Sequence, residues 1–193
     1  MRNVVVSTYV TLDGVMQPLD WTAPFAHPVH GAYSRALLFA SDALVMGRET
    51  YESFAGVWAS RTSADDEPGE EGFIDRINSL PKYVASTTLQ APLAWNNSHV
   101  IEGDVADAVA ELKRQPGQNI LMYGCGPVAR ALLQRGLIDE LRLWVYPVIA
   151  GSGEHIFNGA VAPTYFHHVD THPFNSGVVV QTYRPKRERS APQ

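Results

Sequence analysis

The feature of this sequence that most constrains its fold is a short apolar run that passes directly into a helical segment. Residues 43–46 have the length and composition of a buried strand, and apolar side chains then recur at helical spacing. Gly47, Arg48 and Thr50 stand where the two meet. A strand that turns into a helix N-terminus presents unpaired backbone N–H groups and the positive end of the helix dipole.

These three residues suit a phosphate group. Gly47 allows close approach of the backbone, Arg48 offers a planar cation and Thr50 offers a hydroxyl. Phosphate groups bind readily at helix N-termini. A tight turn with a solvated arginine explains the same residues, and this corner alone does not decide between the two interpretations.

Length and composition are those of one globular protein. The chain has 193 residues, of which 45% are hydrophobic and 18% are charged. We expect a single domain over residues 1–183 and a flexible basic tail over residues 184–193. The net charge of -5, without a basic stripe, argues against a nucleic-acid partner. The sequence shows no leader and no apolar run of about 20 residues, which predicts a cytoplasmic protein without a membrane partner.

Cysteine and histidine positions predict no metal site. Cys125 is the single cysteine, so an internal disulfide and a cysteine zinc cage are excluded. His168 and His172 would lie about 13 Å apart on one face of a strand, too far for one metal ion. We interpret Cys125 as a small structural residue in a glycine turn rather than as a reactive thiol.

Strand and helix patterns alternate up to residue 139. The apolar periodicity predicts strands at residues 3–10, 43–46, 82–86, 98–101 and 119–123. It predicts helices at residues 30–40, 50–57, 73–80, 105–114 and 128–135. Alternation of this kind is typical of a largely parallel sheet with crossover connections. Strands without intervening helices follow at residues 141–149, 165–171 and 177–183, so we expect the sheet to end in antiparallel strands.

Two irregular stretches interrupt this pattern. Residues 14–28 are rich in proline and aromatic residues, which suits a binding loop or lid or, alternatively, a packed surface crossing. Residues 61–72 are polar, acidic and broken by proline and glycine. This composition predicts an exposed insertion.

A second glycine corner follows the strand at residues 119–123. Gly124-x-Gly126-x-x-Ala129 has the spacing of a dinucleotide-binding fingerprint. Its late position, and the lack of an acid at the end of the next strand, argue against a Rossmann fold. The corner still supplies a second helix N-terminus with close backbone approach, and two such corners can hold one dinucleotide.

Several of these stretches resemble a known superfamily. Residues 46–54 (MGRETYESF) are similar to the cofactor-binding corner of the dihydrofolate reductase superfamily. Residues 7–14 and 124–157 are similar to its riboflavin-pathway branch, the reductase domain of the bifunctional deaminase/reductase and its stand-alone relatives. The resemblance covers residues 3–183. It implies an α/β, dihydrofolate reductase-like three-layer fold, with a mixed, mostly parallel sheet, flanking helices and antiparallel C-terminal strands. It also implies NADPH as cofactor and a homodimer.

The same resemblance implies which residues would hold NADPH. Those at the adenosine phosphates and 2′-phosphoribose are Gly47, Arg48, Thr50, Ser86 and Thr87. Those against the pyrophosphate are Gly124, Gly126, Pro127 and Val128. Those at the nicotinamide are Ser7, Thr8 and Tyr123. The loop after Asp13 matches the loop that closes over the nicotinamide.

The sequence departs from dihydrofolate reductases at the pterin site. Those enzymes carry a carboxylate on the first helix, where this chain has Gly31 and Ala32, and residues 30–40 contain no acid. The threonine that supports this carboxylate is matched by Trp144. We therefore do not expect folate reduction as the main activity. Asp13 is the nearest candidate for a catalytic proton source, although an Asp before Gly more often forms a turn.

The substrate pocket is expected to be aromatic. Its predicted residues are Trp21, Phe25, Tyr33, Leu37, Phe54 and Trp58. His27, His30 and Arg35 lie nearby in the sequence, with Arg35 as the strong cation. This composition favours a flat, weakly charged substrate. Core packing is the alternative role for Tyr33 and Leu37.

Together, the residues and the resemblance predict an NADPH-dependent oxidoreductase. It would transfer a hydride to a heteroaromatic (pyrimidine- or pterin-like) or small imine or carbonyl substrate. The similar activity in riboflavin biosynthesis is 5-amino-6-(5-phosphoribosylamino)uracil reductase. The alternatives are a non-catalytic nucleotide- or ligand-binding module and a dihydrofolate reductase.

Overall fold

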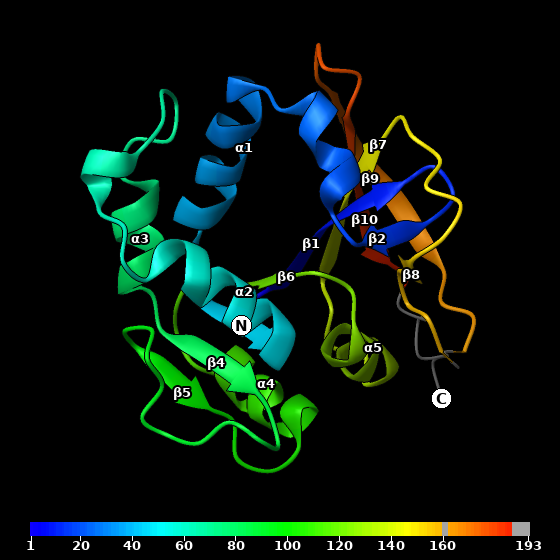
Figure 1. The fold of residues 1–193 in the computed structure, drawn as a ribbon. Coiled ribbons are helices and arrows are strands. Elements are labelled where there is room, and N and C mark those ends of the chain that lie inside the picture. The colour runs from blue at the N-terminus through cyan, green and yellow to red at the C-terminus, as the bar shows by residue number, and fades with distance from the viewer. Residues whose placement is uncertain (160–161, 187–193) are drawn as a thin grey trace.

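The protein is built on one eight-stranded sheet and a small second sheet (Figure 1). The structure is a computed structural model, described here for residues 1–159 and 162–186. The strand order of the main sheet is β5 (Ser98–Val100), β4 (Lys82–Ala85), β3 (Ser41–Gly47), β6 (Asn119–Tyr123), β1 (Val4–Thr11), β7 (Glu140–Tyr146), β10 (Val179–Pro185) and β9 (Phe166–Pro173). The second sheet pairs β2 (Val15–Gln17) with β8 (Glu154–His155).

Strand directions confirm the mixed, mostly parallel sheet expected from the sequence. The strands from β5 to β7 pair in parallel, whereas β10 runs antiparallel to both β7 and β9. In the register, Gly47 of β3 pairs with Ala85 of β4, and Ser7 of β1 pairs with Tyr123 of β6. The carboxyl ends of four neighbouring strands therefore meet at one edge of the sheet. In open sheets of this kind, ligands bind outside this edge.

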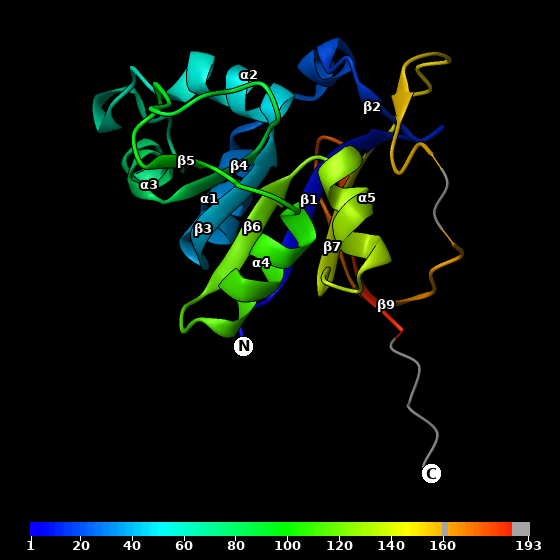
Figure 2. The ribbon, with the colours of Figure 1, turned by 90° about the horizontal axis from the view of Figure 1, so that it is seen from below.

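Helices cover both faces of the sheet, giving three layers (Figure 2). One face carries α1 (Pro28–Phe39), α2 (Arg48–Trp58) and α3 (Phe73–Ser79). The other carries α4 (Val105–Arg114) and α5 (Pro127–Gln134). Because side chains alternate along a strand, β1 places Val4 and Val6 in the core under α4 and α5, and Val5 in the core under α1 and α3.

A third cluster lies on the C-terminal part of the sheet and is mainly aromatic. Trp144 and Tyr146 of β7 are buried there with Phe174, which follows β9. Trp144 stacks on Phe174 with ring centroids 5.4 Å apart. The 3-10 helix η1 (Asp20–Phe25) covers part of this cluster. Aromatic packing therefore stabilises this C-terminal part of the sheet.

The two irregular stretches contain more structure than the sequence predicted. Residues 14–28 include β2 and η1. Residues 61–72 include the 3-10 helix η2 (Ser63–Asp65). The Asp66 carboxylate also accepts hydrogen bonds from the N–H groups of Gly72 at 2.6 Å and Ile74 at 3.1 Å. The insertion is therefore fastened to the start of α3.

At the C-terminus, β10 continues through Pro185, beyond the expected domain boundary at residue 183. The predicted flexible tail lies mostly in residues 187–193, which are outside the described residues. Within the described ranges, none of the helices combines the length and apolar character needed to span a bilayer.

Candidate active site

Two helix N-termini meet at the carboxyl edge of the sheet. Gly47 and Gly126 are the N-cap residues of α2 and α5, and neither helix has a side-chain cap hydrogen bond. A Cβ placed on Gly47 would lie 3.5 Å from Val128 Cγ2, and one on Gly124 would lie 3.9 Å from Thr50 Oγ1. The two corners predicted from the sequence are therefore neighbours. Their N–H groups lack side-chain partners at the same edge, which suits an anionic ligand.

A polar groove of about 560 Å³ lies on one side of these corners. Arg48, Ser86 and Thr87 line it together, as predicted for a 2′-phosphate site. The Arg48 guanidinium lies 3.4 Å from the Glu52 carboxylate, and both side chains are about half exposed, so this pair contributes little. Asp104, the N-cap of α4, is the acid in the lining.

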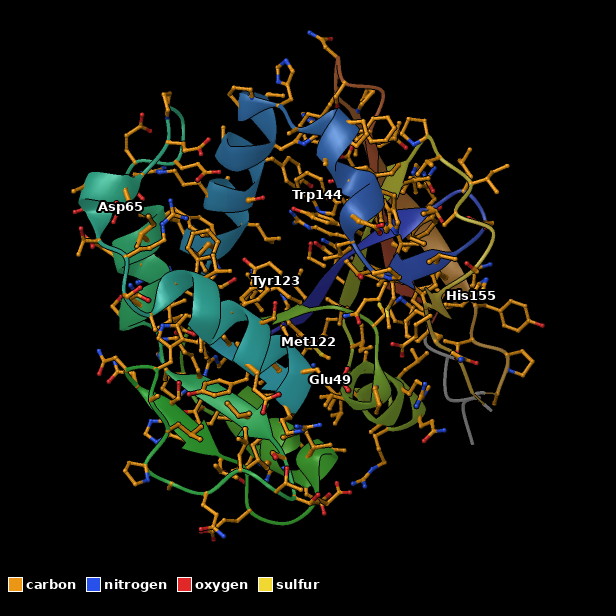
Figure 3. The ribbon with its side chains drawn as sticks, in the orientation of Figure 1. Glu49, Asp65, Met122, Tyr123, Trp144 and His155 are labelled. Carbon is orange, nitrogen blue, oxygen red and sulfur yellow. The ribbon has the colours of Figure 1, made fainter. Side chains whose placement is uncertain are left out.

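A more apolar cleft of about 270 Å³ lies on the other side of the first turn of α2. It is formed mainly by α1, α2 and β1. In Figure 3, Tyr123 and Trp144 lie near this central region, with Glu49 at the start of α2. The predicted residues that the structure brings to the cleft are Ser7, Thr8, Leu37, Thr50, Phe54, Trp58, Tyr123 and Gly124.

The sequence analysis missed other residues of the cleft. These are Tyr9, Met16, Gln17, Leu19, Ser34, Glu49, Ser53, Glu70, Phe73 and Trp144. Tyr9 shares one face of β1 with Ser7, so strand alternation was a signal for it. Glu70 had no such signal, because the local sequence does not distinguish it from its acidic neighbours Glu67 and Glu71.

Tyr123 presents an unused hydrogen-bonding group in the cleft. Its hydroxyl is buried and has no hydrogen-bond partner among the residues that the structure describes. Burial raises the pKa of Tyr123, so the hydroxyl is protonated at neutral pH. Its ring lies 5.1 Å from the Phe54 ring, centroid to centroid. Since buried polar groups are normally paired, this hydroxyl indicates a place for a ligand atom.

Ser7 and Trp144 form the floor of the cleft. The Trp144 indole N–H donates to Ser7 Oγ at 3.1 Å, and both side chains are buried. The Ser7 carbonyl accepts from the Gly124 N–H at 3.0 Å, which joins β1 to the second glycine corner. These bonds fix the position of the cleft floor relative to α5.

Glu70 reaches the cleft from the segment 61–72. A Cβ placed on Gly31 of α1 would collide with the Oε1, Cγ and Cδ atoms of Glu70. The absence of a side chain at Gly31 therefore lets the carboxyl lie against the helix.

The environment of Glu70 shifts the pKa of its carboxyl group above the ordinary value. Burial is the main cause that raises the pKa of Glu70, and the charges of Glu67 and Asp66 add to it, while Arg61 opposes it. The structure thus places an acid with a raised pKa beside the first helix, although that helix itself contains no acid.

Three residues predicted for the substrate pocket lie outside this cleft and pack on aromatic residues. Trp21 and Phe25 pack on Tyr146 at centroid distances of 5.1 and 5.6 Å. Tyr33 packs on Trp144 at 5.1 Å. None of the three lines the cleft. They cover the aromatic face of the C-terminal strands from η1 and α1.

Asp13, the candidate proton source, is not among the lining residues of the cleft and has the turn-forming role that the sequence analysis gave as the more common one. Its carboxylate accepts a hydrogen bond from the Thr11 hydroxyl at 2.5 Å and from the N–H groups of Ala150 and Gly151 at 3.1 and 2.8 Å. These bonds, led by that of Thr11, lower the pKa of Asp13 to about 2. Asp13 therefore ties the β1–β2 turn to the loop after β7 and is ionised at neutral pH.

Cys125 has the structural role expected for it. The residue is fully buried, and burial raises the pKa of its thiol to about 12. Within residues 1–159 and 162–186, no group of His, Cys, Asp and Glu side chains has the arrangement of a metal site.

The fold and the joined corners define a dihydrofolate reductase-like α/β protein with a ligand cleft at the carboxyl edge of its sheet. The chain belongs to the RibD C-terminal domain family, whose model matches residues 2–180. This membership confirms the riboflavin-pathway branch that the sequence motifs resemble.

Two proteins of Bacillus subtilis (strain 168) are similar over nearly their whole length. The uncharacterized protein YyaP is 28% identical over 187 residues, which cover 94% of each chain. The uncharacterized protein YwjB is 23% identical over 192 residues, which cover 95% of this chain and 98% of YwjB.

Solved structures share the fold at low sequence identity. One of them is a Shewanella sp. PV-4 protein whose name assigns it to riboflavin biosynthesis. It superposes with a TM-score of 0.73 at 24% sequence identity, and the match covers 96% of this chain and 99% of that one. A pyrimidine reductase-like protein from Corynebacterium diphtheriae superposes with a TM-score of 0.65 at 14% sequence identity. The match covers 97% of this chain and 93% of that one.

A longer structure places the same fold in one part of a larger protein. The Thermotoga maritima diaminohydroxyphosphoribosylaminopyrimidine deaminase/5-amino-6-(5-phosphoribosylamino)uracil reductase gives a TM-score of 0.60 at 16% identity. The match covers 96% of this chain and 57% of the Thermotoga protein.

Proposed function

We propose that this protein is an NADPH-dependent reductase that transfers a hydride to a planar heteroaromatic or small imine or carbonyl substrate. The observation that carries the proposal is the pair of adjacent, uncapped helix N-termini at α2 and α5. A groove with Arg48, Ser86 and Thr87 lies on one side of the pair, and a cleft with Tyr123 lies on the other. The reductase activity in the name of the Thermotoga neighbour supports the same class of reaction.

The residues at this edge fit NADPH. A Cβ placed on Gly126 would meet no atom within 4 Å, so there is open space for a pyrophosphate at the start of α5. Arg48, with Ser86 and Thr87 beside it, would neutralise and hydrogen-bond the 2′-phosphate. In the adjoining cleft, the unpaired Tyr123 hydroxyl would gain a partner from the ring that binds there beside the cofactor.

When bound, NADPH supplies the hydride. The chain's own residues would bind and orient a flat substrate against it. Phe54 and Trp58 give the cleft aromatic walls and Trp144 gives it an aromatic floor, and these rings exclude water and favour a planar ring. The bond between Trp144 and Ser7 holds the floor in place. Positioning of this kind supplies a large part of the rate in a reaction whose chemistry belongs to the cofactor.

The test is a titration of the purified protein with NADPH and with NADH, followed by nicotinamide fluorescence with tryptophan as energy donor. Arg48→Ala should weaken NADPH binding about 10- to 100-fold, as expected for a lost charged hydrogen bond, and should change NADH binding less than about twofold. Arg114→Ala is the matched control, because Arg114 is an exposed arginine of α4 that pairs with Glu111.

Equal losses for NADPH and NADH in Arg48→Ala would contradict the 2′-phosphate assignment. Failure of the unmodified protein to bind either cofactor would contradict the reductase and leave a ligand-binding module as the function. The homodimer and the cytoplasmic location stay predictions, to be tested by light scattering and cell fractionation.

A further inference from the structure

The charges that line the cleft are all negative. Among the described lining residues, the charged ones are Glu49 and Glu70, and the others are apolar or neutral polar. Arg61 is the cation that acts on Glu70, but it lies over the Trp58 ring at 5.3 Å and donates to the Asp65 carbonyl at 3.3 Å. A phosphate group in the cleft would therefore face two carboxylates without a lining cation.

Glu70 is held at the cleft by its own segment. The collision that a Cβ on Gly31 would cause shows how closely the Glu70 side chain lies against α1. Next to it, a Cβ on Gly69 would lie 3.8 Å from Ala32 Cβ. On the other side, Arg35 of α1 donates to the Glu71 carbonyl at 2.6 Å. These contacts fix the backbone on both sides of Glu70.

Other polar groups surround the same part of the cleft. Tyr9 and Ser34 line it with Glu70. Burial raises the pKa of Tyr9, and the Glu70 charge adds to that shift, which places the two groups within electrostatic range. Tyr123 contributes its unpaired hydroxyl. A carboxyl group among neutral hydroxyls and aromatic rings is suited to accept hydrogen bonds from the N–H groups of a planar ring.

We infer that Glu70 binds the hydrogen-bond-donor edge of the substrate, and that the cleft takes a planar, N–H-bearing ring that is neutral or cationic and carries no phosphate. This inference rests on the proposed function for the cofactor half, but it concerns only the substrate half. It makes the segment 61–72 part of the substrate site. It also distinguishes this chain from a reductase whose substrate carries a ribose phosphate.

The first experiment measures the affinity of 2,4-diaminopyrimidine, a planar basic ring with N–H donors, from quenching of tryptophan fluorescence. Glu70→Gln should weaken this binding at least about 10-fold, because a charged hydrogen bond becomes a neutral one. Glu67→Gln, which makes the same change on a neighbouring acid outside the lining, should stay within about twofold. No binding to the unmodified protein, or equal binding to Glu70→Gln, would overturn the inference.

The second experiment tests the sign of the charge effect. Binding of 5-amino-6-(5-phosphoribosylamino)uracil should be weak in the unmodified protein, and Glu70→Gln should strengthen it, since one repelling carboxylate is removed. The two compounds thus respond to one substitution in opposite directions, which misfolding does not produce. Strong binding of the phosphorylated compound to the unmodified protein would overturn the inference.

The third experiment tests the contact with α1. Gly31→Ala should displace the Glu70 side chain and weaken 2,4-diaminopyrimidine binding about as much as Glu70→Ala does. In the double variant the two losses should not add, because both remove the same contact. Fully additive losses would overturn the role assigned to this contact.

NADPH affinity, measured in the same variants, separates the two proposals. Retained NADPH binding with unchanged ring binding in Glu70→Gln would refute the inference and leave the reductase standing. The opposite outcome is also possible to recognise. If the unmodified protein binds no NADPH but Glu70→Gln loses ring binding, the reductase proposal is refuted and the role of Glu70 is retained.

Discussion

The polar groove and the apolar cleft lie on either side of the first turn of α2, yet they are assembled in different ways. The groove takes its residues from the ends of adjacent parallel strands, and Arg48, Ser86 and Thr87 follow those strands directly. The cleft combines such residues with Glu70 from an acidic insertion and Trp144 from β7. The half proposed for the cofactor therefore depends on local corners, whereas the half proposed for the substrate depends on contacts between distant segments.

This difference assigns separate tasks to the two halves. Strand-to-helix corners present backbone N–H groups wherever such a corner forms, so they recognise a phosphate with few special side chains. The cleft, in contrast, needs the Glu70 side chain, which can lie against α1 only because Gly31 has no side chain. Relatives that share the corners can therefore differ in substrate. Three further substitutions test how independent the halves are.

The largest effect is expected from Gly126→Val. The space beside Gly126 is open, so a valine side chain would occupy the volume proposed for the pyrophosphate. NADPH affinity should fall on the order of 100-fold, while the free energy of unfolding changes by about 1 kcal/mol, as expected for a poorer N-cap residue. Binding of 2,4-diaminopyrimidine should stay within about twofold.

The control for that variant is Gly56→Ala. Gly56 lies in α2, where an added Cβ would likewise meet no atom within 4 Å, but it is remote from the corner of α5. The substitution should leave NADPH binding unchanged and stabilise the helix slightly. If Gly126→Val lost both ligands equally, the groove and the cleft would not be independent.

A smaller effect on ligand binding, in the cleft rather than in the groove, is expected from Tyr123→Phe. Removing a buried hydroxyl that has no partner should stabilise the ligand-free protein by about 1 kcal/mol, which raises its melting temperature by about 2–4 °C. The same change should weaken the binding of a ring in the cleft about fivefold, because one hydrogen bond to the ligand is lost.

Thermal unfolding and ring titration of the same sample measure both effects of Tyr123→Phe. Tyr165→Phe, at an exposed tyrosine, should change neither. A destabilised Tyr123→Phe protein would show that the hydroxyl is already paired without a ligand.

The smallest effect is expected from Asp13→Asn, and it concerns pH. The pKa of Asp13 is about 2 in the folded protein against an ordinary 3.8, so the carboxylate stabilises the fold fully above about pH 4. That contribution is lost as the pH falls through about 2. Denaturant unfolding between pH 5 and 2 should therefore depend less on pH in Asp13→Asn. A changed pH–rate profile near neutrality would instead restore a catalytic role for Asp13.

The groove could be predicted from the sequence because its signals are short-range. Gly47, Arg48 and Thr50 form one continuous stretch, and the strand pattern before them places the corner at the carboxyl edge. The same reasoning located Gly124, whereas the resemblance to the reductase family pointed to Tyr123. Sequence reasoning could not decide between a pocket and a packed cluster for Trp21, because loop aromatics suit both equally well in a sequence.

The sequence by itself determined the order of the main-sheet strands and of the five α-helices, the mixed sheet and both helix N-termini, because hydrophobic period and glycine position act within a few residues. Tertiary structure decided which residues face the cleft. Glu70 reaches it only because residues 61–72 fold back over α1 at Gly31. Asp13 is removed from it because its carboxylate binds the backbone near Gly151. Both outcomes depend on contacts between segments distant in the sequence, which no local pattern specifies.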